Sequence, residues 1–127
     1  MRDIKFRGLY ENIGIWRTGS LIICEPKPSI FWNDEDKSYQ YIVKPETVGQ
    51  YIGLRDKDGF EIYEGDIVRF QYIGSEWKIG FIEFLENRCC FLINSEGGHY
   101  GIMGDEDCIR KMEVMGNIHE NPELLKK

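Results

Sequence analysis

The sequence predicts a mainly β fold of antiparallel sheets with little helix. Short runs rich in Ile, Val, Phe and Tyr alternate with Gly and Asp-Gly breaks, which is the pattern of short strands joined by tight turns. Turn residues recur roughly every ten positions, as in a barrel or a strongly coiled sheet. No stretch keeps a 3.6-residue hydrophobic period over the length of a helix.

The size and charge of the chain limit its possible classes. Its 127 residues fit one domain, so we predict a single domain over residues 1–127. Hydrophobic residues make up 42% and aromatic residues 13%, too much for a disordered chain. The net charge of −6 repels phosphate at long range, so nucleic acid is a disfavoured partner that would require a local basic patch.

The start of the chain and its hydropathy predict a cytoplasmic protein. Residues 1–10 carry charges but no apolar segment of signal-peptide length. No apolar run reaches the ~18 residues that span a bilayer, so we expect no membrane partner. The four cysteines, Cys24, Cys89, Cys90 and Cys108, are then expected to be reduced thiols.

The first third of the chain predicts three short strands and a loop. Ile4–Phe6 alternates with charged neighbours, as a half-buried strand does. Ile13–Trp16 and Leu21–Cys24 flank Arg-Thr-Gly-Ser at 17–20, which we interpret as a hairpin turn. Residues 25–38 contain two prolines and an Asn-Asp-Glu-Asp cluster, so this stretch is expected to be a loop or insertion.

The remainder of the chain predicts a meander of strands. We expect tight turns at Asp58-Gly59, Gly65-Asp66 and Glu86-Asn87, with positive φ at Gly59 and Gly65. Single helical turns are expected at Asp105–Arg110 and Pro122–Lys126. The expected strands are Val48–Leu54, Phe60–Tyr63, Ile67–Tyr72, Trp77–Leu85, Arg88–Ile93, Tyr100–Met103 and Val114–Ile118.

Residues that could react or bind a metal are few. Cys89, Cys90, His99 and Cys108 could be zinc ligands, but the only close pair is adjacent, and adjacent strand side chains point to opposite faces. No nucleophile elbow, P-loop or G-x-G-x-x-G is present. We therefore predict a non-enzyme with no catalytic residue, no metal, no cofactor and no small-molecule substrate.

Two alternatives remain open. Acidic clusters at 33–36, 56–66 and 105–107 could hold Mg²⁺ or act as acid and base, so a metal-dependent enzyme is one of them. The other is a nucleic-acid-binding β-barrel, in which aromatic and basic side chains form a stacking platform for a single strand. The residues of that platform would be Arg69, Phe70, Tyr72, Trp77, Lys78, Phe81 and Arg88.

Three segments carry a family resemblance. I-K-F-R at Ile4–Arg7, the long block V-G-Q-Y-I-G-L-R-D-K-D-G-F-E-I-Y-E-G-D-I-V at Val48–Val68, and V-M-G-N-I-H-E-N-P-E-L-L at Val114–Leu125 resemble the YopX family of phage and prophage proteins. The resemblance implies a β-rich fold with coiled or bifurcated sheets and a partly SH3-like barrel. It also implies a homo-oligomer in a bacterial host cell, and it brings no catalytic residue.

The sequence departs from the family pattern in places. After I-K-F-R the family usually continues with a small residue and Trp-Asp, whereas this chain has Gly8–Glu11. Segments 25–40 and 86–105 match no pattern of the family, so the resemblance assigns them no role.

The charged and aromatic residues of the central block form a candidate interaction surface. Exposed charge pairs contribute only about 0–1 kcal/mol each, so a dense set favours binding over stability; the other interpretation is that the block maintains its turns. We predict an accessory protein that associates with itself and binds a host or phage protein. The candidate residues are Tyr51, Arg55, Asp56, Glu61, Tyr63, Glu64, Asp66 and Arg69.

Overall fold

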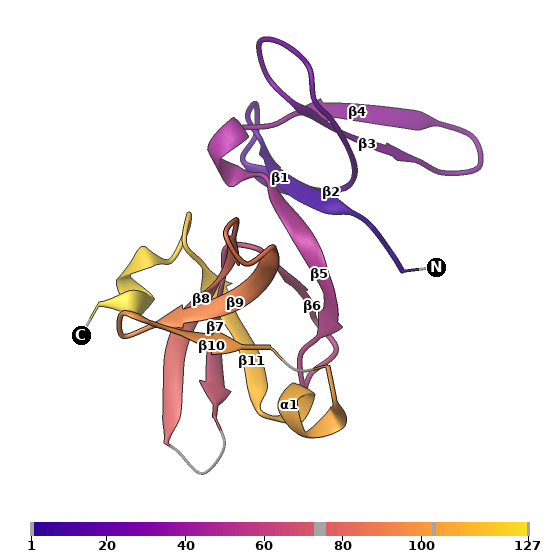
Figure 1. Cartoon of the computed structure of the whole chain (residues 1–127). Helices are drawn as coiled ribbons and strands as arrows, with labels where there is room; N and C mark the ends of the chain where they lie inside the picture. Colours follow the sequence, from indigo (N-terminus) through magenta and orange to yellow (C-terminus); the bar gives the residue numbers. More distant parts are fainter. Residues whose placement is uncertain (1, 73–75, 103, 127) are drawn as a thin grey trace. The chain divides into compact units, whose positions relative to one another are not determined.

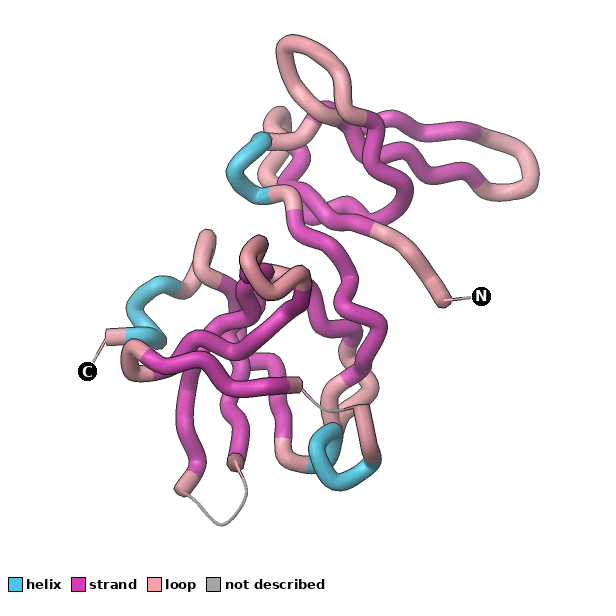
Figure 2. Tube along the Cα trace, viewed as in Figure 1, coloured by secondary structure: helices cyan, strands magenta, loops and turns pink. Residues whose placement is uncertain are grey.

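The computed structural model describes residues 2–72, 76–102 and 104–126, and these form two compact units (Figures 1 and 2). Unit 1 extends to Tyr51, and unit 2 begins at Ile52. The strand ladders are antiparallel, which confirms the predicted mainly β, antiparallel fold. Met103, at the end of one predicted strand, lies outside the described residues.

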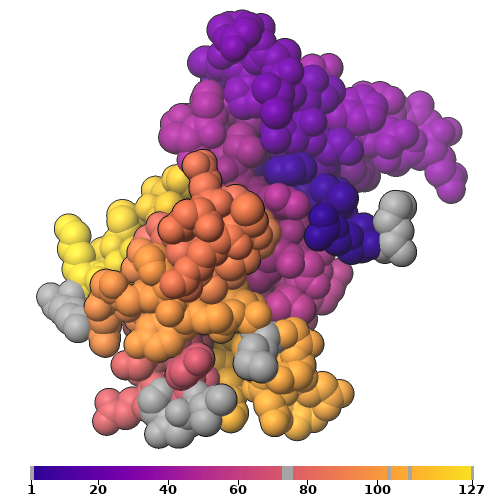
Figure 3. Space-filling view, viewed as in Figure 1, coloured from indigo at the N-terminus to yellow at the C-terminus, as the bar shows by residue number. Residues whose placement is uncertain are grey.

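Unit 1 is a coiled antiparallel sheet with the strand order β4-β3-β2-β1, followed by the first residues of β5. A short 3₁₀ turn, η1 (Pro45–Thr47), leads into β5. The β3–β4 hairpin forms a narrow projection of this unit (Figure 3). The strands are β1 (Phe6–Tyr10), β2 (Ile15–Ile22), β3 (Ser29–Asn33), β4 (Ser38–Ile42) and β5 (Gly49–Arg55).

The end of β4 returns to β1 in unit 1. Tyr10 and Val43 form a single β-bridge, and the amide of Lys44 donates to the carbonyl of Leu9 at 3.0 Å. Val43 and Ile30 are fully buried and form the centre of this unit. Because one bridge replaces a full ladder, the described strands do not close into a barrel.

The predicted hairpin at 17–20 was wrong. β2 runs straight through this segment, and the turn lies earlier, at residues 11–14, where the amide of Gly14 donates to the carbonyl of Tyr10 at 2.9 Å. Gly19 pairs with Phe6 inside the ladder, and a side chain there would collide with the Phe31 carbonyl. The first strand is also shifted, since it begins at Phe6 rather than at Ile4.

The loop predicted for 25–38 contains a strand. Both prolines precede β3, which begins at Ser29. The acidic cluster makes the tight turn between β3 and β4, where Asp34 Oδ1 accepts the amides of Asp36 and Lys37 at 2.9 and 2.8 Å. The prolines and the acidic cluster were therefore correctly interpreted as non-strand residues. The prediction missed the five residues of β3 that lie between them.

Unit 2 contains the rest of β5 and a five-stranded sheet in the order β10-β9-β8-β7-β11. β6 lies beside β5 at the end of the other sheet. The elements are β6 (Glu61–Tyr63), β7 (Asp66–Gln71), β8 (Trp77–Leu85), β9 (Cys90–Ser95), β10 (Gly98–Gly101), α1 (Glu106–Arg110), β11 (Met112–Asn117) and the 3₁₀ turn η2 (Pro122–Leu125).

Most predicted elements of unit 2 are confirmed. Gly59 and Gly65 have φ of +87° and +92°, as their turns require. The β8–β9 turn is longer than the predicted two residues, because the amides of Arg88 and Cys89 both turn back to carbonyls at 85 and 86. β9 accordingly starts at Cys90.

One apolar cluster holds unit 2 together. It gathers side chains from β6, β7, β8, β9 and β11, with η2 packed against β8 outside it. None of the helices in the part of the chain that the structure describes is long and apolar enough to cross a membrane. The buried members are Ile62, Val68, Phe70, Ile82, Ile93 and Met112.

Candidate interaction surfaces

Half of the candidate surface residues are buried. Tyr51, Asp56, Tyr63 and Asp66 are exposed by 8%, 3%, 4% and 2%. A side chain with so little accessible area cannot form much of a contact with a partner. The interaction surface predicted for this block therefore rests on its other four members, Arg55, Glu61, Glu64 and Arg69, which are exposed or half-buried.

Asp56 joins a turn to a distant strand. Its Oδ1 accepts the amides of Asp58 and Phe60, each at 2.9 Å. Its Oδ2 accepts the amide of Val114 on β11, also at 2.9 Å. The carboxylate thus satisfies three backbone donors, which compensates for its removal from water.

Asp66 has a similar role at the next turn. Its Oδ2 accepts the amide of Tyr63 at 2.8 Å and closes the β6–β7 turn. Near this turn, the Tyr63 hydroxyl donates to Glu61 at 3.0 Å, and Arg55 Nη2 lies 3.4 Å from the other Glu61 oxygen. These contacts support the interpretation that the block maintains its turns.

The C-terminal segment of the resemblance also has a structural role. Asn117 Oδ1 accepts the amides of His119 and Glu120 at 3.0 and 2.9 Å. In return, the amide of Asn117 donates to Asn121 Oδ1 at 3.2 Å. The two asparagines lock the turn that leads into η2.

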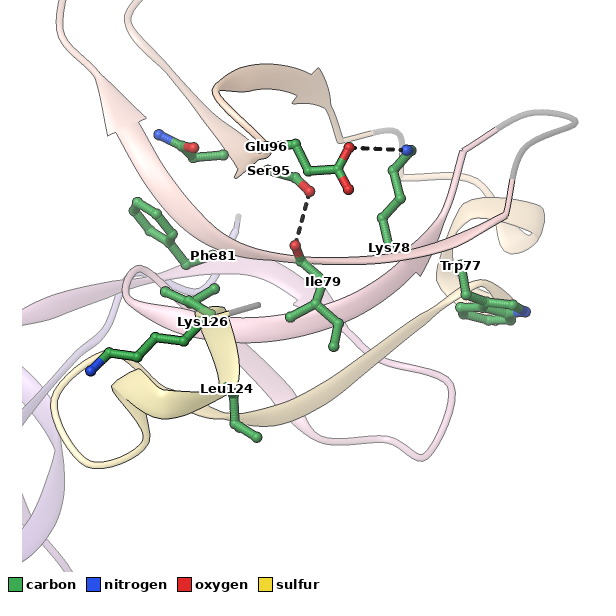
Figure 4. Close-up of a pocket in the computed structure, with 10 residues that line it drawn as sticks. Trp77, Lys78, Ile79, Phe81, Ser95, Glu96, Leu124 and Lys126 are labelled. Atoms are coloured by element: carbon green, nitrogen blue, oxygen red, sulfur yellow. Dashed lines mark hydrogen bonds and ion pairs between the residues drawn. The ribbon is translucent and has the colours of Figure 1, made fainter.

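Between β8 and η2, unit 2 has a groove of about 410 Å³ that is lined by apolar and polar residues in equal number (Figure 4). Trp77, Ile79 and Phe81 line it from β8, and Leu124 and Leu125 line it from η2. Trp77 and Ile79 are each 40% exposed. The sequence predictions used Trp77 and Phe81 but missed the leucines, which become groove residues only through the fold of the C-terminal turn.

Charged side chains surround this groove. Lys78 Nζ lies 3.5 Å from Glu96 Oε2 on the β9–β10 side (Figure 4). Close by, the Arg69 guanidinium lies over the Trp77 ring, 4.3 Å from its centre. The Arg69 Nε is 3.9 Å from Glu113 Oε2, so both cations have carboxylate neighbours.

The predicted nucleic-acid platform does not form one surface. Phe70 is 4% exposed and belongs to the core. Phe70 pairs with Lys78, and Arg69 pairs with Ile79, so these two pairs lie on opposite faces of the sheet. Arg69 covers one face of Trp77, whereas base stacking requires an open ring face.

Unit 1 has an aromatic pocket that the sequence predictions did not identify. It measures about 350 Å³ and is lined by Trp16, Arg17, Thr18, Trp32 and Tyr41. The Arg17 guanidinium lies 4.4 Å from the centre of the Tyr41 ring. The sequence indication was the alternation of Tyr39 and Tyr41 along β4, directly after the segment interpreted as a loop.

No metal site is evident among the described residues, since no group of three or more His, Cys, Asp or Glu side chains could hold an ion there. The residues proposed as zinc ligands are not brought together. His99 Nε2 instead lies 3.1 Å from Glu83 Oε1, and the four cysteines are free thiols.

Comparison with known proteins shows the family of the chain and a solved structure with a similar fold. The family model described as "YopX protein" matches residues 6–126. The crystal structure of protein EF1440 from Enterococcus faecalis is similar, with a TM-score of 0.62 and 22% sequence identity over 99% of this chain and 100% of that chain. At this identity the likeness shows the fold. A search of the curated proteins found no match.

Proposed function

Since the chain belongs to the YopX family, we propose that it is a phage- or prophage-encoded accessory protein that acts in the bacterial cytoplasm by binding polypeptides. It performs no chemistry of its own. The groove of unit 2 between β8 and η2 is its binding surface, and the first occupant of this groove is a second copy of the chain. A host or phage protein is the further partner.

The observation that supports this proposal is the pair of exposed apolar side chains, Trp77 and Ile79, that line the groove. Trp77 and Ile79 are each 40% exposed to solvent. Phe81 and Leu124, which are also apolar, line the same groove. Protein interfaces have an apolar centre, a polar rim and a concentration of Trp and Arg. The Arg69–Trp77 stack at 4.3 Å provides this last feature.

The distribution of charge supports a second copy as the occupant. Unit 2 has nine basic and fifteen acidic residues, a net charge of −6. The groove is lined by Lys78 and Lys126 with one acid, Glu96. The groove carries more basic than acidic side chains, whereas unit 2 as a whole is acidic. The groove is therefore complementary in charge to the acidic surface of a second copy, which favours association of the two copies.

Light scattering coupled to gel filtration tests this proposal. The wild-type protein is expected to elute as an oligomer that dissociates on dilution. Ile79→Lys places a charge at the centre of the groove and should weaken association at least tenfold, about 1.4 kcal/mol. Ile23→Lys is the matched control, because Ile23 is 85% exposed in unit 1. A wild-type monomer at every concentration, or an oligomer unaffected by Ile79→Lys, would contradict the proposal.

The two alternatives stay predictions. The nucleic-acid alternative loses its single platform, because its residues are divided between two faces of the sheet. A metal-dependent enzyme would be revealed by thermal stabilisation with Mg²⁺ or Mn²⁺ through mass action.

A further inference from the structure

The aromatic pocket of unit 1 has the volume of a small-ligand site. Its volume of about 350 Å³ falls within the roughly 300–1,000 Å³ of such sites, which combine mainly apolar walls with a few polar groups. Three of its five lining residues are aromatic: Trp16, Trp32 and Tyr41. Arg17 and Thr18 are the other two lining residues; they are adjacent in β2, so their side chains point to opposite faces of the sheet, and the polar group of the pocket is the Arg17 guanidinium.

Arg17 is a cation without a carboxylate partner among the described residues. Its side chain is half-buried, and no acid lines the pocket. Its Nε is buried without an acceptor in the described part of the chain. Arg69, which lies over Trp77, also has a buried Nε without a hydrogen-bond acceptor in the described part of the chain, but it has the Glu113 carboxylate at 3.9 Å.

Stacking leaves an arginine able to bind an anion. The face of the Arg17 guanidinium lies over Tyr41, whereas the N–H donors of a guanidinium point outward in its plane. This planar fork matches the oxygens of a phosphate or carboxylate. A half-buried cation with no internal counterion is stabilised when such an anion binds.

One aromatic ring of the pocket is open enough to stack on a ligand. Arg7 lies over Trp16 at 4.8 Å, and Arg17 lies over Tyr41. Trp32 stacks on Tyr39 at 5.3 Å, yet 47% of its surface is exposed. The open indole of Trp32 can stack on one ring of a ligand, and the Arg17 guanidinium can bind one anionic group of the same ligand.

The charge of unit 1 permits an anionic ligand. Residues 1–51 contain seven basic and seven acidic residues, so unit 1 has no net charge. The whole net charge of −6 belongs to unit 2. Unit 1 itself therefore adds no net repulsion of phosphate to that of unit 2.

From these observations we infer that the pocket of unit 1 binds a planar aromatic ring that carries a phosphate, as in a nucleoside monophosphate. The ring stacks on Trp32, and the Arg17 guanidinium binds the phosphate. The ligand is a free nucleotide or the phosphorylated end of a strand, which share this chemistry. The inference does not depend on the groove of unit 2 or on self-association.

The test follows the indole N–H signals of the full-length protein by NMR during titration with adenosine monophosphate. The chain has three tryptophans, of which Trp16 and Trp32 line the pocket and Trp77 lies in unit 2. The expected result is a saturable shift of the Trp16 and Trp32 signals with no shift of Trp77. Adenosine alone and inorganic phosphate alone should each bind at least tenfold more weakly.

Substitutions distinguish this site from general binding. Arg17→Met keeps the length of the side chain and should lower the affinity for adenosine monophosphate at least tenfold. Arg55→Met is the matched control, because Arg55 is an exposed arginine of unit 2 and should leave binding unchanged. Dispersed Trp16 and Trp32 indole signals in ligand-free Arg17→Met show that unit 1 is folded, and Trp32→Leu provides a second variant that should remove the preference for a ring.

The outcomes separate the sources of the ligand and can overturn the inference. A 5′-phosphorylated oligonucleotide that binds more tightly than the mononucleotide, with the same dependence on Arg17, would assign a strand end. Equal or weaker binding would assign a free nucleotide. Absence of saturable shifts at millimolar nucleotide, equal affinity for adenosine, or full affinity in Arg17→Met would overturn the inference.

Discussion

Asp56 is an acidic residue that is almost fully buried, and its position is explained by three backbone donors. Two of these donors, at Asp58 and Phe60, are local, and the third is Val114 on β11. Hydrogen bonds to a charged group are stronger than those between neutral groups. The carboxylate therefore fixes the turn and attaches it to a strand 58 residues further along the chain.

Asp56→Ala should be among the most destabilising single changes in unit 2. It leaves three amides without this acceptor, and we expect a loss of about 2–4 kcal/mol in the free energy of unfolding. Urea denaturation measures this loss. Asp58→Ala is the matched control in the same exposed turn and should remain within about 0.5 kcal/mol of wild type. A loss below 1 kcal/mol for Asp56→Ala would contradict the role described.

The sequence could predict the turn at Asp56 but not its burial. Asp-x-Asp-Gly is a turn pattern, because an aspartate side chain accepts amides a few residues ahead. Acidic residues are seldom fully buried, so an interaction surface was the natural interpretation. The deciding contact is with Val114, and no local pattern shows which distant strand will supply a donor.

At the scale of elements, the predictions succeeded where turn residues marked both ends of a strand. β8 occupies Trp77–Leu85, as predicted. β2 was missed because Gly19 and Ser20 were interpreted as a turn, whereas Gly19 lies within the strand where the Phe31 carbonyl approaches. A glycine that admits a neighbouring strand and a glycine that forms a turn look the same in a sequence.

The turn that leads into η2 depends on the Asn117 side chain. Removing this side chain should destabilise only the segment around η2. Asn117→Ala removes the acceptor for the amides of His119 and Glu120. We expect amide hydrogen exchange over residues 119–125 to accelerate by about tenfold, since one or two hydrogen bonds of about 1 kcal/mol each are lost. Exchange in β8 should stay unchanged.

Asn87→Ala is the control for this experiment, because Asn87 lies on the exposed β8–β9 turn. It should alter exchange in neither segment. Equal acceleration over β8 and η2 in Asn117→Ala would show instead that unit 2 unfolds as a whole. Since Leu124 and Leu125 form one wall of the groove, Asn117→Ala should also weaken self-association.

At the scale of the whole molecule, the two units share a strand. The boundary between Tyr51 and Ile52 falls inside β5, so the polypeptide passes from one unit to the other without a linker. The beginning of β5 pairs with β1, and β6 lies beside β5 in the same sheet. Loss of order in β5 must therefore affect both units.

A shared strand predicts one cooperative unfolding transition. The indole signals of Trp16, Trp32 and Trp77 report on both units and should disappear at the same urea concentration. Ile82→Ala, at a fully buried position of unit 2, should cost about 2–5 kcal/mol and lower the midpoint of all three signals. A midpoint that falls for Trp77 alone would show that the units unfold separately.

The net charge of the chain is distributed unevenly between its two units. The sequence gives −6 for 127 residues, from which repulsion of phosphate was expected everywhere. The structure assigns this charge to unit 2 and none to unit 1. The net charge of the whole chain could not show this division, because no linker marks the boundary within β5.

The pairing of β11 with β7 has a consequence for synthesis on the ribosome. The ladders of unit 1 need only residues up to about Gln50, so this unit can form while translation continues. β7 emerges soon afterwards but must wait for Met112–Asn117 to be translated. In this interval the nascent chain exposes an unpaired strand edge, and such edges recruit other strands. Chaperone binding is therefore expected to be strongest on chains arrested between β7 and β11.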